Sequence, residues 1–335
     1  MSEFPANVPG PQDPDFLTSL GGLFMAAKML LTASEVNLFA ALADGPRTLE
    51  EVAAATGLPW RSVHVLLHGL ASFGVLEAKG GKFANGRAAQ EQLTGRGPDD
   101  VRAGLRLYDQ ITWSLWTNLE QTVRSGQPAR LAKPSADFAR IFSEGVEAFT
   151  RPAAAALTRA YDFSPHRRIL DLAGGTGSYL LPILGQHASI SATLYELPQA
   201  ADAARRRLSA DPLGARVEIV EGDALFDPIP GGHDVVLLAN TIHLFAPDKV
   251  KLLFRRTRDA VAPGARLVIP EYWVDSTHTR PFLGAMLAGT FLLLAGDGTT
   301  YSPEEARVWL EATGWRMLAH RPLLGAITVV VAEAV

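Results

Sequence analysis

A glycine-rich segment that follows a short apolar run is the part of the sequence best suited to hold a small ligand. It reads Asp-Leu-Ala-Gly-Gly-Thr-Gly over residues 171–177, and residues 169–172 have the composition of a buried strand. Glycine has no Cβ, so the backbone of such a turn approaches a ligand closely and adopts positive φ angles without a clash. We therefore expect Gly174, Gly175 and Gly177 to form a ligand-binding turn.

The acidic residues near this turn indicate which ligand it takes. The third glycine of a dinucleotide motif would fall at Leu180, and no phosphate-binding G-x-x-x-x-G-K-[ST] pattern occurs in the chain. Asp171 is poorly placed for a pyrophosphate but suits a cationic ligand that carries an amino group. Glu196 ends the next apolar run, 25 residues after Asp171, where a carboxylate can accept hydrogen bonds from both hydroxyls of a ribose.

One histidine is placed where it can reach a bound substrate. His243 lies four residues after the apolar run 234–239. In a doubly wound sheet the carboxyl ends of the strands form the ligand crevice, so a side chain at this position faces it. An imidazole with a pKa of ~6.5 can accept a proton near neutral pH.

Short apolar runs alternate with helical patterns after Pro165 and would position these residues. Five such runs cover residues 169–172, 192–196, 217–221, 234–239 and 267–271, and two further strand-like runs follow at 316–320 and 327–332. Alternating strands and helices imply a parallel sheet with helices on both faces. We predict an α/β fold with a Rossmann-like, seven-stranded, doubly wound sheet and one antiparallel edge strand.

The chain before this sheet is mostly helical in pattern. Residues 1–15 predict a flexible arm, and residues 16–98 predict helices followed by a hairpin around Gly80-Gly81, which is the order of a winged helix. Thr48 with Glu50 and Glu51 predicts a helix start. The expected domains are an arm (1–15), a winged-helix dimerisation domain (16–98), a helical linker that contributes to the substrate pocket (99–160) and a cofactor-binding domain (161–335).

In this order the motifs resemble those of the class I S-adenosylmethionine-dependent methyltransferases, and more narrowly the O-methyltransferases that include plant caffeate-type and bacterial polyketide and phenazine enzymes. The resemblance covers nearly the whole chain from about residue 20, and rests on 171–177, Glu196-Leu-Pro, Gly222-Asp223, His243 and Glu271. It implies S-adenosylmethionine as cofactor, S-adenosylhomocysteine as product, a small-molecule acceptor and a homodimer formed through the N-terminal domain.

The resemblance also implies a role for each matched residue. Asp171 and the backbone of the glycine turn would hold the methionine part of the cofactor, Glu196 the ribose, and Asp223 with Ala224 the adenine. Leu197 and Asn240 complete the expected cofactor contacts. The family motif usually has glycine where this chain has Ala173, and an alanine methyl is expected to be tolerated there if the φ angle is negative.

In the resembled enzymes the histidine removes the proton of the acceptor hydroxyl, because a phenol with a pKa near 10 is a poor nucleophile until it is deprotonated. His243 and Glu271 are the expected catalytic residues. Leu244-Phe245 follows the histidine in place of the usual Asp-Trp, and the second acidic partner falls near Thr300, which carries no charge. Asp297 is a candidate substitute, and catalysis by proximity without a base is the alternative mechanism.

Candidates for the acceptor pocket come from the two regions that flank the crevice in the resembled family. They are Trp113, Trp116, Phe149, Met286 and Phe291. Aromatic residues at helical spacing also build cores, so a structural role is the alternative for each. An apolar lining fits a planar phenol, quinone or polyketide-like metabolite. No metal site is expected, since the other histidines form no cluster with acidic residues in the sequence.

Composition excludes or disfavours several other functions. The 335-residue chain has 31 Lys and Arg against 35 Asp and Glu, a net charge of −4, and no cysteine. Thiolate chemistry and disulfides are therefore excluded. The helix predicted at 61–72 has one arginine, too few for a DNA-reading helix. The alternative functions are carbon or nitrogen methylation, non-methylating chemistry with the same cofactor, and a winged-helix regulator.

The N-terminal residues also bear on location. Residues 1–15 contain acidic residues and no basic residue, unlike a secretory signal. The apolar stretches 16–33 and 282–295 are shorter or more interrupted than the ~20 residues that a membrane span needs. We expect a soluble cytoplasmic protein with no membrane or nucleic-acid partner.

Overall fold

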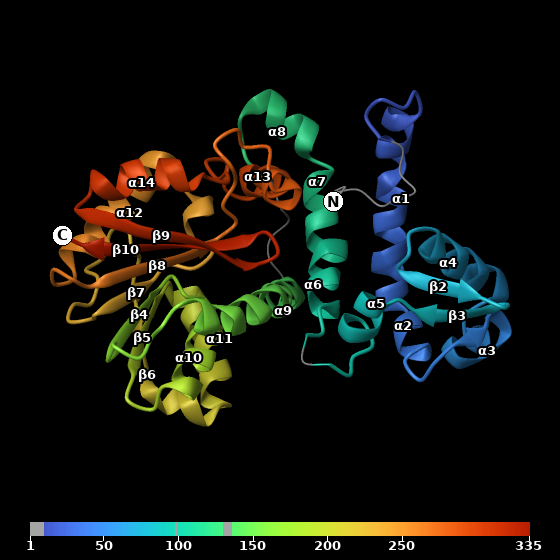
Figure 1. Cartoon of the computed structure of the whole chain (residues 1–335), viewed down its shortest axis with the longest axis horizontal. Helices are drawn as coiled ribbons and strands as arrows, with labels where there is room; N and C mark the ends of the chain where they lie inside the picture. Colours follow the sequence, from blue (N-terminus) through green and yellow to red (C-terminus); the bar gives the residue numbers. More distant parts are fainter. Residues whose placement is uncertain (1–9, 98, 130–135) are drawn as a thin grey trace. The chain divides into compact units, whose positions relative to one another are not determined.

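The computed structural model describes residues 10–97, 99–129 and 136–335 (Figure 1). These residues form two compact units. The first comprises the described residues up to Ser114 together with the first part of helix α9 (Ala136–Ala160), through Phe149. The second comprises the described residues from Leu115 to Ala129 and all residues from Thr150 onward. The segment predicted as a linker, 99–160, is thus divided between the two units.

The second unit is built on a seven-stranded sheet, which confirms the predicted doubly wound architecture (Figure 1). Its strands are β4 (Arg168–Leu172), β5 (Ser191–Glu196), β6 (Val217–Glu221), β7 (Val235–Leu237), β8 (Arg266–Glu271), β9 (Trp315–Leu324) and β10 (Ile327–Ala334). They lie in the order β6-β5-β4-β7-β8-β10-β9, and the first five are parallel. β10 is antiparallel to both of its neighbours. The antiparallel strand therefore lies one position inside the edge, because β10 inserts between β8 and its hairpin partner β9.

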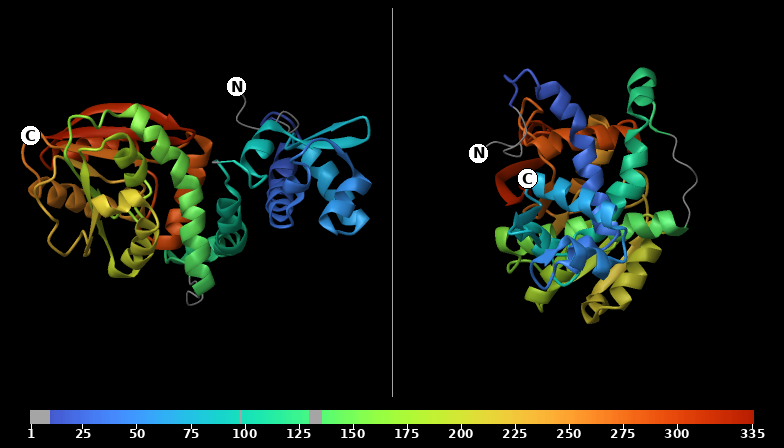
Figure 2. Two further views of the ribbon diagram at one scale, coloured as in Figure 1. Left: turned by 90° about the horizontal axis from the view of Figure 1, so that it is seen from below. Right: turned by 90° about the vertical axis from the view of Figure 1, so that its right-hand side faces the viewer.

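Helices cover both faces of this sheet (Figure 2). Successive side chains of a strand point to opposite faces, so Ile169 packs on one face and Leu170 on the other. The first face is covered by α10 (Leu180–Gln186), α11 (Pro198–Ser209) and the second part of α9, and the other by α12 (Pro247–Asp259) and α14 (Pro303–Glu311). A strand buried on both faces is apolar throughout, and Asp171 in β4 is an exception that requires a reason.

The first unit holds the elements of the N-terminal region. They are α1 (Phe16–Glu35), α2 (Leu38–Ala41), β1 (Arg47–Thr48), α3 (Leu49–Thr56), α4 (Trp60–Ser72), β2 (Leu76–Lys79), β3 (Lys82–Asn85), α5 (Arg87–Gln92), α6 (Arg102–Leu107) and a π-helical turn (Tyr108–Thr112) that leads into α7 (Trp113–Trp116). The predicted helix start is confirmed: the Thr48 hydroxyl accepts the N–H of Glu51, whose carboxylate accepts the N–H of Thr48. β1 was not predicted, because two residues give no alternating pattern.

The N-terminal end differs from the prediction in one respect. Residues 1–9 of the predicted arm and the predicted boundary at residue 98 lie outside the described residues. α1 runs unbroken through Lys28 for 20 residues and has a mean hydropathy of 1.5. It is therefore long and apolar enough to span a membrane, by length and composition alone, whereas the sequence pattern predicts a stretch that is too interrupted. Only 11% of its apolar window is buried within the chain, which leaves Leu20 and Phe24 exposed.

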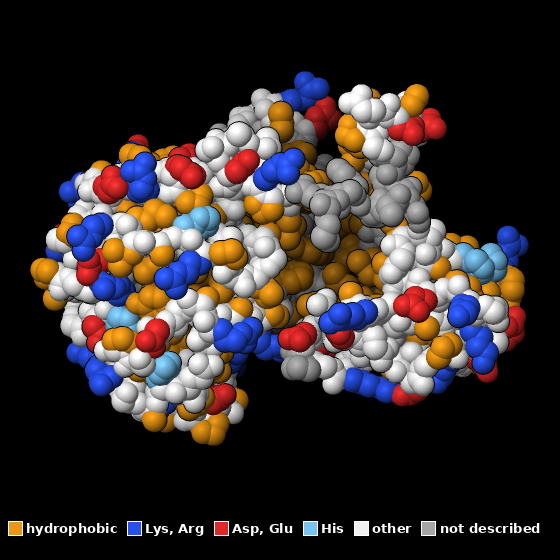
Figure 3. Space-filling model, viewed as in Figure 1, with side chains coloured by type: hydrophobic (Ala, Val, Ile, Leu, Met, Phe, Trp, Pro, Cys, Tyr) orange, Lys and Arg blue, Asp and Glu red, His pale blue; other side chains and the backbone are white. Residues whose placement is uncertain are grey.

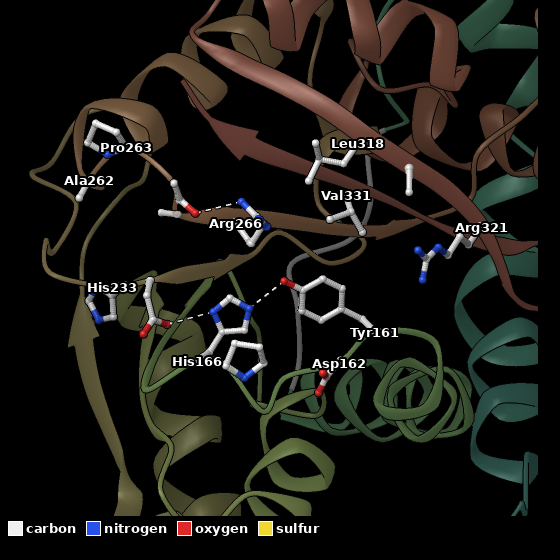
Figure 4. Close-up of a pocket in the computed structure, with 15 residues that line it drawn as sticks. Tyr161, Asp162, His166, His233, Ala262, Pro263, Arg266, Leu318, Arg321 and Val331 are labelled. Carbon is white, nitrogen blue, oxygen red and sulfur yellow. Dashed lines mark hydrogen bonds and ion pairs between the residues drawn. The ribbon is translucent and has the colours of Figure 1, made fainter.

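A cavity of about 680 Å³ opens at the amino ends of β7 and β8, at the opposite edge of the sheet from the predicted site (Figure 4). Its polar groups bind one another: Nδ1 of His166 lies 3.3 Å from the Asp234 carboxylate, and Nε2 lies 2.8 Å from the Tyr161 hydroxyl. Asp234 also accepts the backbone N–H of Arg167 at 2.8 Å. Because these groups are hydrogen-bonded to one another, we interpret the cluster as a structural contact that holds the segment between α9 and β4 in place.

His233 also lines this cavity and is buried. Its Nε2 lies 2.9 Å from the Thr193 hydroxyl and its Nδ1 lies 3.1 Å from the Pro230 carbonyl oxygen. Burial lowers the pKa of His233, and the charge of Arg168 lowers it further.

Acidification should therefore destabilise the second unit through His233. Because its pKa is lower in the folded state than in the unfolded state, its contribution to stability is complete above pH ~6.5 and is lost as the pH falls toward the folded pKa. We expect the free energy of unfolding, measured with urea between about pH 7.5 and pH 5, to fall less steeply in His233→Gln than in the wild type. The exposed His68→Gln is the control, and equal slopes in all three proteins would contradict this assignment.

Candidate active site

The predicted site residues lie along the carboxyl edge of the parallel strands. Asp171, Glu196 and Glu271 belong to β4, β5 and β8, while Asp223 and Asn240 follow β6 and β7. Given the strand order β6-β5-β4-β7-β8, these five positions succeed one another as Asp223, Glu196, Asp171, Asn240 and Glu271. The carboxyl edge is where doubly wound sheets bind their ligands.

Asp171 is a fully buried carboxylate at the centre of this row. Neither of its oxygens has a hydrogen-bond partner among the described residues. Burial, and to a lesser degree the charge of Glu196, raise the pKa of Asp171 to about 7. A buried acceptor without a donor costs ~1–3 kcal/mol, and more when it is charged, so a cationic ligand with N–H donors would relieve an existing instability here.

The glycine turn is shaped by this carboxylate. A Cβ at Gly174 would lie 2.3 Å from Cγ of Asp171, so the close approach requires glycine. Gly175 and Gly177 have φ angles of +60° and +76°. The condition for Ala173 is not met: its φ angle is +55°, a conformation that costs a residue with a Cβ about 1–2 kcal/mol. The turn imposes it, because the N–H of Ala173 donates to the Tyr195 carbonyl at 2.8 Å and continues the pairing of β4 with β5.

Glu196 reaches from β5 to the glycine turn. Its Oε2 accepts the N–H of Gly175 at 2.8 Å, and its Oε1 accepts the N–H of Leu197 at 2.7 Å. Burial raises the pKa of Glu196, and the two backbone hydrogen bonds oppose this shift. The carboxylate is thus held in one orientation with a further lone pair on each oxygen, which suits two ligand hydroxyls. The side chain of Leu197 remains exposed beside it.

Asp223 lies in the loop after β6. Its Oδ1 accepts the N–H of Leu225 at 2.8 Å, so one oxygen stabilises the turn. A Cβ at the preceding residue, Gly222, would lie 2.1 Å from the Tyr195 hydroxyl, which explains the glycine. The carbonyl of Ala224 accepts the Nε–H of Arg256 at 2.8 Å, and this contact holds the loop on α12.

His243 and Glu271 form a buried pair. His243 lies in a short 3₁₀ helix, η3 (Ile242–Leu244), and is 7% exposed, while Glu271 is 1% exposed. Nδ1 of His243 lies 2.7 Å from Oε1 of Glu271, which also accepts the N–H of Tyr272 at 2.8 Å. In the neutral tautomer whose proton is on Nδ1, Glu271 accepts that proton and Nε2 is left as an acceptor.

Contacts from one helix and the loop after it fix the imidazole. The ring of Phe291, in α13 (Phe282–Ala295), stacks on that of His243 with 3.7 Å between centroids and 11° between planes. The carbonyl oxygen of His243 accepts the N–H of Thr299 at 3.0 Å. Asp297 does not act as a second acidic partner, since its carboxylate binds Nζ of Lys249 at 3.0 Å on the surface. Thr300 is buried.

Tyr179 belongs to the site although the sequence pattern did not point to it. It directly follows the glycine turn, is 4% exposed, and its hydroxyl accepts the Nδ2–H of Asn240 at 3.4 Å. Asn240 has a φ angle of +50°, and its Oδ1 is buried without a hydrogen-bond partner among the described residues. The two residues are 61 positions apart, so only the pairing of β4 with β7 brings them together.

The five candidates for the acceptor pocket are divided between the units. Trp113 and Phe149 belong to the first, and Trp116, Met286 and Phe291 to the second. Within the first unit, Phe149 packs directly on Gly104. Within the second, Nε1–H of Trp116 donates to the Thr290 hydroxyl at 3.0 Å, and Met286 is exposed on α13.

On the face in Figure 3, basic and acidic side chains are interspersed. In the part of the chain that the structure describes, no three His, Asp or Glu side chains gather in a way that could hold a metal ion.

Comparison with known proteins supports the same class of protein. Residues 119–316 match the model of the O-methyltransferase domain, and residues 18–95 match that of the O-methyltransferase dimerisation domain. The 3-hydroxy-5-methyl-1-naphthoate 3-O-methyltransferase of Streptomyces sahachiroi is 29% identical over 316 residues, which cover 91% of this chain and 90% of that protein. The phenazine O-methyltransferase PhzM of Lysobacter antibioticus is 27% identical over 325 residues, with 93% and 94% covered.

Solved structures of similar proteins have the same fold as this chain. The structure of PigF with S-adenosylhomocysteine is 27% identical, with a TM-score of 0.80, and covers 96% of this chain and 99% of its own. Human N-acetylserotonin methyltransferase in complex with S-adenosylmethionine has the same fold, with a TM-score of 0.84 at 21% identity over 98% of this chain and 99% of its own.

The fold is that of an S-adenosylmethionine-dependent methyltransferase. The chain belongs to the O-methyltransferase family that carries an N-terminal dimerisation domain. Its cofactor is S-adenosylmethionine. The described residues fit this group, because both oxygens of Asp171, Oδ1 of Asn240 and Oε2 of Glu271 are buried acceptors without donors, and the cofactor carries an ammonium and a sulfonium.

Asp171→Asn tests this fit. The folded pKa of Asp171, about 7, lies above its unfolded value, so its contribution to stability is complete below pH ~3.8 and is lost as the pH rises toward 7. The ligand-free variant should therefore be more stable than the wild type above pH ~7, by up to about 4 kcal/mol, and the difference should shrink toward pH ~4. S-adenosylhomocysteine should raise the melting temperature of the wild type much more than that of the variant.

The matched control is Asp223→Asn at the same edge, where the carboxylate is only partly buried. The difference in unfolding free energy between Asp223→Asn and the wild type should stay constant across this pH range. Parallel pH profiles for wild type and Asp171→Asn would show that the buried carboxylate is not the source of the instability.

Proposed function

We propose that this protein transfers the methyl group of S-adenosylmethionine to a hydroxyl oxygen of a small aromatic or polyketide-like metabolite, with His243 as the general base. The observation that carries the proposal is the buried hydrogen bond of 2.7 Å between Nδ1 of His243 and Glu271. It fixes the tautomer that has a free acceptor at Nε2.

The chemistry follows from that tautomer. The cofactor supplies an electrophilic methyl group on a sulfonium. Nε2 of His243 would take the proton of the acceptor hydroxyl as that oxygen attacks the methyl carbon, and the cofactor would leave as a neutral thioether. Glu271 then faces an imidazolium, whose charge it stabilises within a buried site. Phe291 keeps the ring in one plane by stacking.

The carboxyl-edge residues would hold the cofactor in the order of the strands. We assign Asp171 and the backbone of Gly174, Gly175 and Gly177 to the methionine part, and Glu196 to the ribose. Asp223, Ala224 and Leu197 would contact the adenine. The support for these assignments is the unpaired state of Asp171 and the fixed orientation of Glu196.

The acceptor class is inferred from relatives and from side-chain chemistry. The names of similar proteins include acceptors built on a naphthoate, on tetracenomycin, on mitomycin and on phenazine. These are different fused-ring molecules, so an aromatic small molecule is the common element. Trp116, Met286 and Phe291 are the residues of the second unit that we assign to its binding.

His243→Ala should lower kcat by roughly 10²–10⁴-fold while the affinity for S-adenosylhomocysteine stays within about twofold. Glu271→Gln, which removes the charge but keeps a hydrogen-bonding side chain, should give a smaller loss. Turnover is measured with radiolabelled methyl donor and a panel of hydroxylated naphthoates, phenazines and quinones.

A loss of only a few-fold in His243→Ala would assign the rate to positioning and contradict a general base. The methylated atom is identified in the product by NMR. A new carbon–methyl or nitrogen–methyl bond would overturn the oxygen acceptor.

We also propose that the protein is a homodimer formed through its N-terminal domain. The match of residues 18–95 to a dimerisation domain supports this. Leu17, Leu20 and Phe24 are exposed at helical spacing on α1, so they form an apolar stripe that a second copy would cover.

Sedimentation of the wild type at micromolar concentration should give about twice the chain mass of 35.9 kDa. Leu20→Glu together with Phe24→Glu should shift the protein to monomer, because burying two carboxylates in an apolar contact is unfavourable. Val308→Glu, at an exposed apolar position on α14, is the control and should stay dimeric. A monomeric wild type would contradict the proposal.

A further inference from the structure

Tyr179 and Asn240 are two polar side chains in contact between the cofactor acid and the catalytic pair. In the order of the strand ends, Asn240 after β7 lies between Asp171 on β4 and Glu271 on β8. Tyr179 joins it from the chain that follows the glycine turn, through the 3.4 Å hydrogen bond from Nδ2.

The two side chains offer opposite hydrogen-bonding groups. The Tyr179 hydroxyl accepts from Asn240, and its proton has no acceptor among the described residues. Burial raises the pKa of Tyr179, and the neighbouring Tyr272 raises it further, so the hydroxyl stays protonated and remains a donor. Asn240 turns its Nδ2 to Tyr179, which leaves the buried Oδ1 as an acceptor without a donor.

The backbone of Asn240 links this pair to the base. Its φ angle of +50° is a conformation that asparagine and glycine adopt more readily than other residues. Its N–H donates to the Pro270 carbonyl at 2.9 Å, one residue before Glu271. His243 follows three residues later, so the turn at Asn240 sets the path of the chain to the catalytic histidine.

We propose that Tyr179 and Asn240 bind the amino-acid end of the cofactor, with the Tyr179 hydroxyl donating to its carboxylate and Oδ1 of Asn240 accepting from its ammonium. The assignment rests on the proposed placement of ribose at Glu196 and methionine at Asp171. A zwitterionic group needs both a donor and acceptors, and Tyr179 supplies the donor next to the acceptors of Asp171 and Asn240.

The test compares two ligands by calorimetry. S-adenosylhomocysteine carries the amino-acid end, whereas 5′-methylthioadenosine has the same nucleoside and sulfur without it. Tyr179→Phe and Asn240→Gly should each weaken S-adenosylhomocysteine by about tenfold or more, the effect of one hydrogen bond to a charged group. Both variants should bind 5′-methylthioadenosine within about twofold of the wild type. The double variant should lose less than the product of the two single losses, because the residues act as a unit.

Two further variants distinguish the loss of the Asn240 side chain from backbone strain, and a specific loss of affinity from the general effect of removing a tyrosine hydroxyl. Asn240→Ala should lose affinity like Asn240→Gly but should melt at a lower temperature, because alanine is strained at this φ angle. Tyr161→Phe removes the hydroxyl at the opposite edge of the sheet and should leave both affinities unchanged.

Equal losses for the two ligands, or no loss of S-adenosylhomocysteine affinity, would overturn the proposal. Binding of 5′-methylthioadenosine reports that the variants are folded. Neither readout depends on the methyl acceptor or on His243, so failure of the proposed general base is detected separately, by turnover.

Discussion

The unpaired carboxylate of Asp171 is the constraint on which the rest of the site depends. It lies inside a sheet buried on both faces and has no donor among the described residues. The chain above it must approach within contact, which Gly174 permits, and must turn through a left-handed residue at Ala173. Each of these features is unfavourable in the protein alone. Together they build a preformed place for a positive charge, which needs little reorganisation when the ligand enters.

The polar groups at the two edges of the sheet in the second unit differ in whether they have hydrogen-bond partners. At the amino edge, His166, Asp234 and Tyr161 satisfy one another, and this edge joins the sheet to α9. At the carboxyl edge, Asp171, Asn240 and Glu271 each have a buried oxygen without a donor among the described residues. Strand order then separates the groups along that edge, with Asp223 at one end and Glu271 with His243 at the other. A sheet whose polar groups are paired at the amino edge can hold unpaired polar groups at the carboxyl edge without losing its fold.

Elements with a strong local signal were predictable from the sequence, and contacts between distant segments were not. β4 is an apolar run that leads into the glycine turn, and β5 and β8 are buried runs that end in glutamate, so these strands and the residues after them could be inferred. The φ angle of Ala173 could not, because its hydrogen bond to Tyr195 overrides the preference of alanine. The contact of Tyr179 with Asn240 requires β7 to lie beside β4. Asp297 has an acidic side chain at a suitable distance in sequence, but Lys249 pairs with it at the surface.

The attachment of His243 to α13 has a consequence for redesign. Phe291 of this helix stacks on the imidazole, and Thr299, just after the helix, holds the His243 carbonyl. Gly298 between them leaves no room for adjustment, since a Cβ there would lie 2.6 Å from the same carbonyl oxygen. Remodelling α13 to admit a bulkier ring system would therefore move the histidine as well. If α13 binds the acceptor and His243 is the base, as we propose, acceptor preference and turnover change together, and a library that varies α13 must vary residues 241–245 with it.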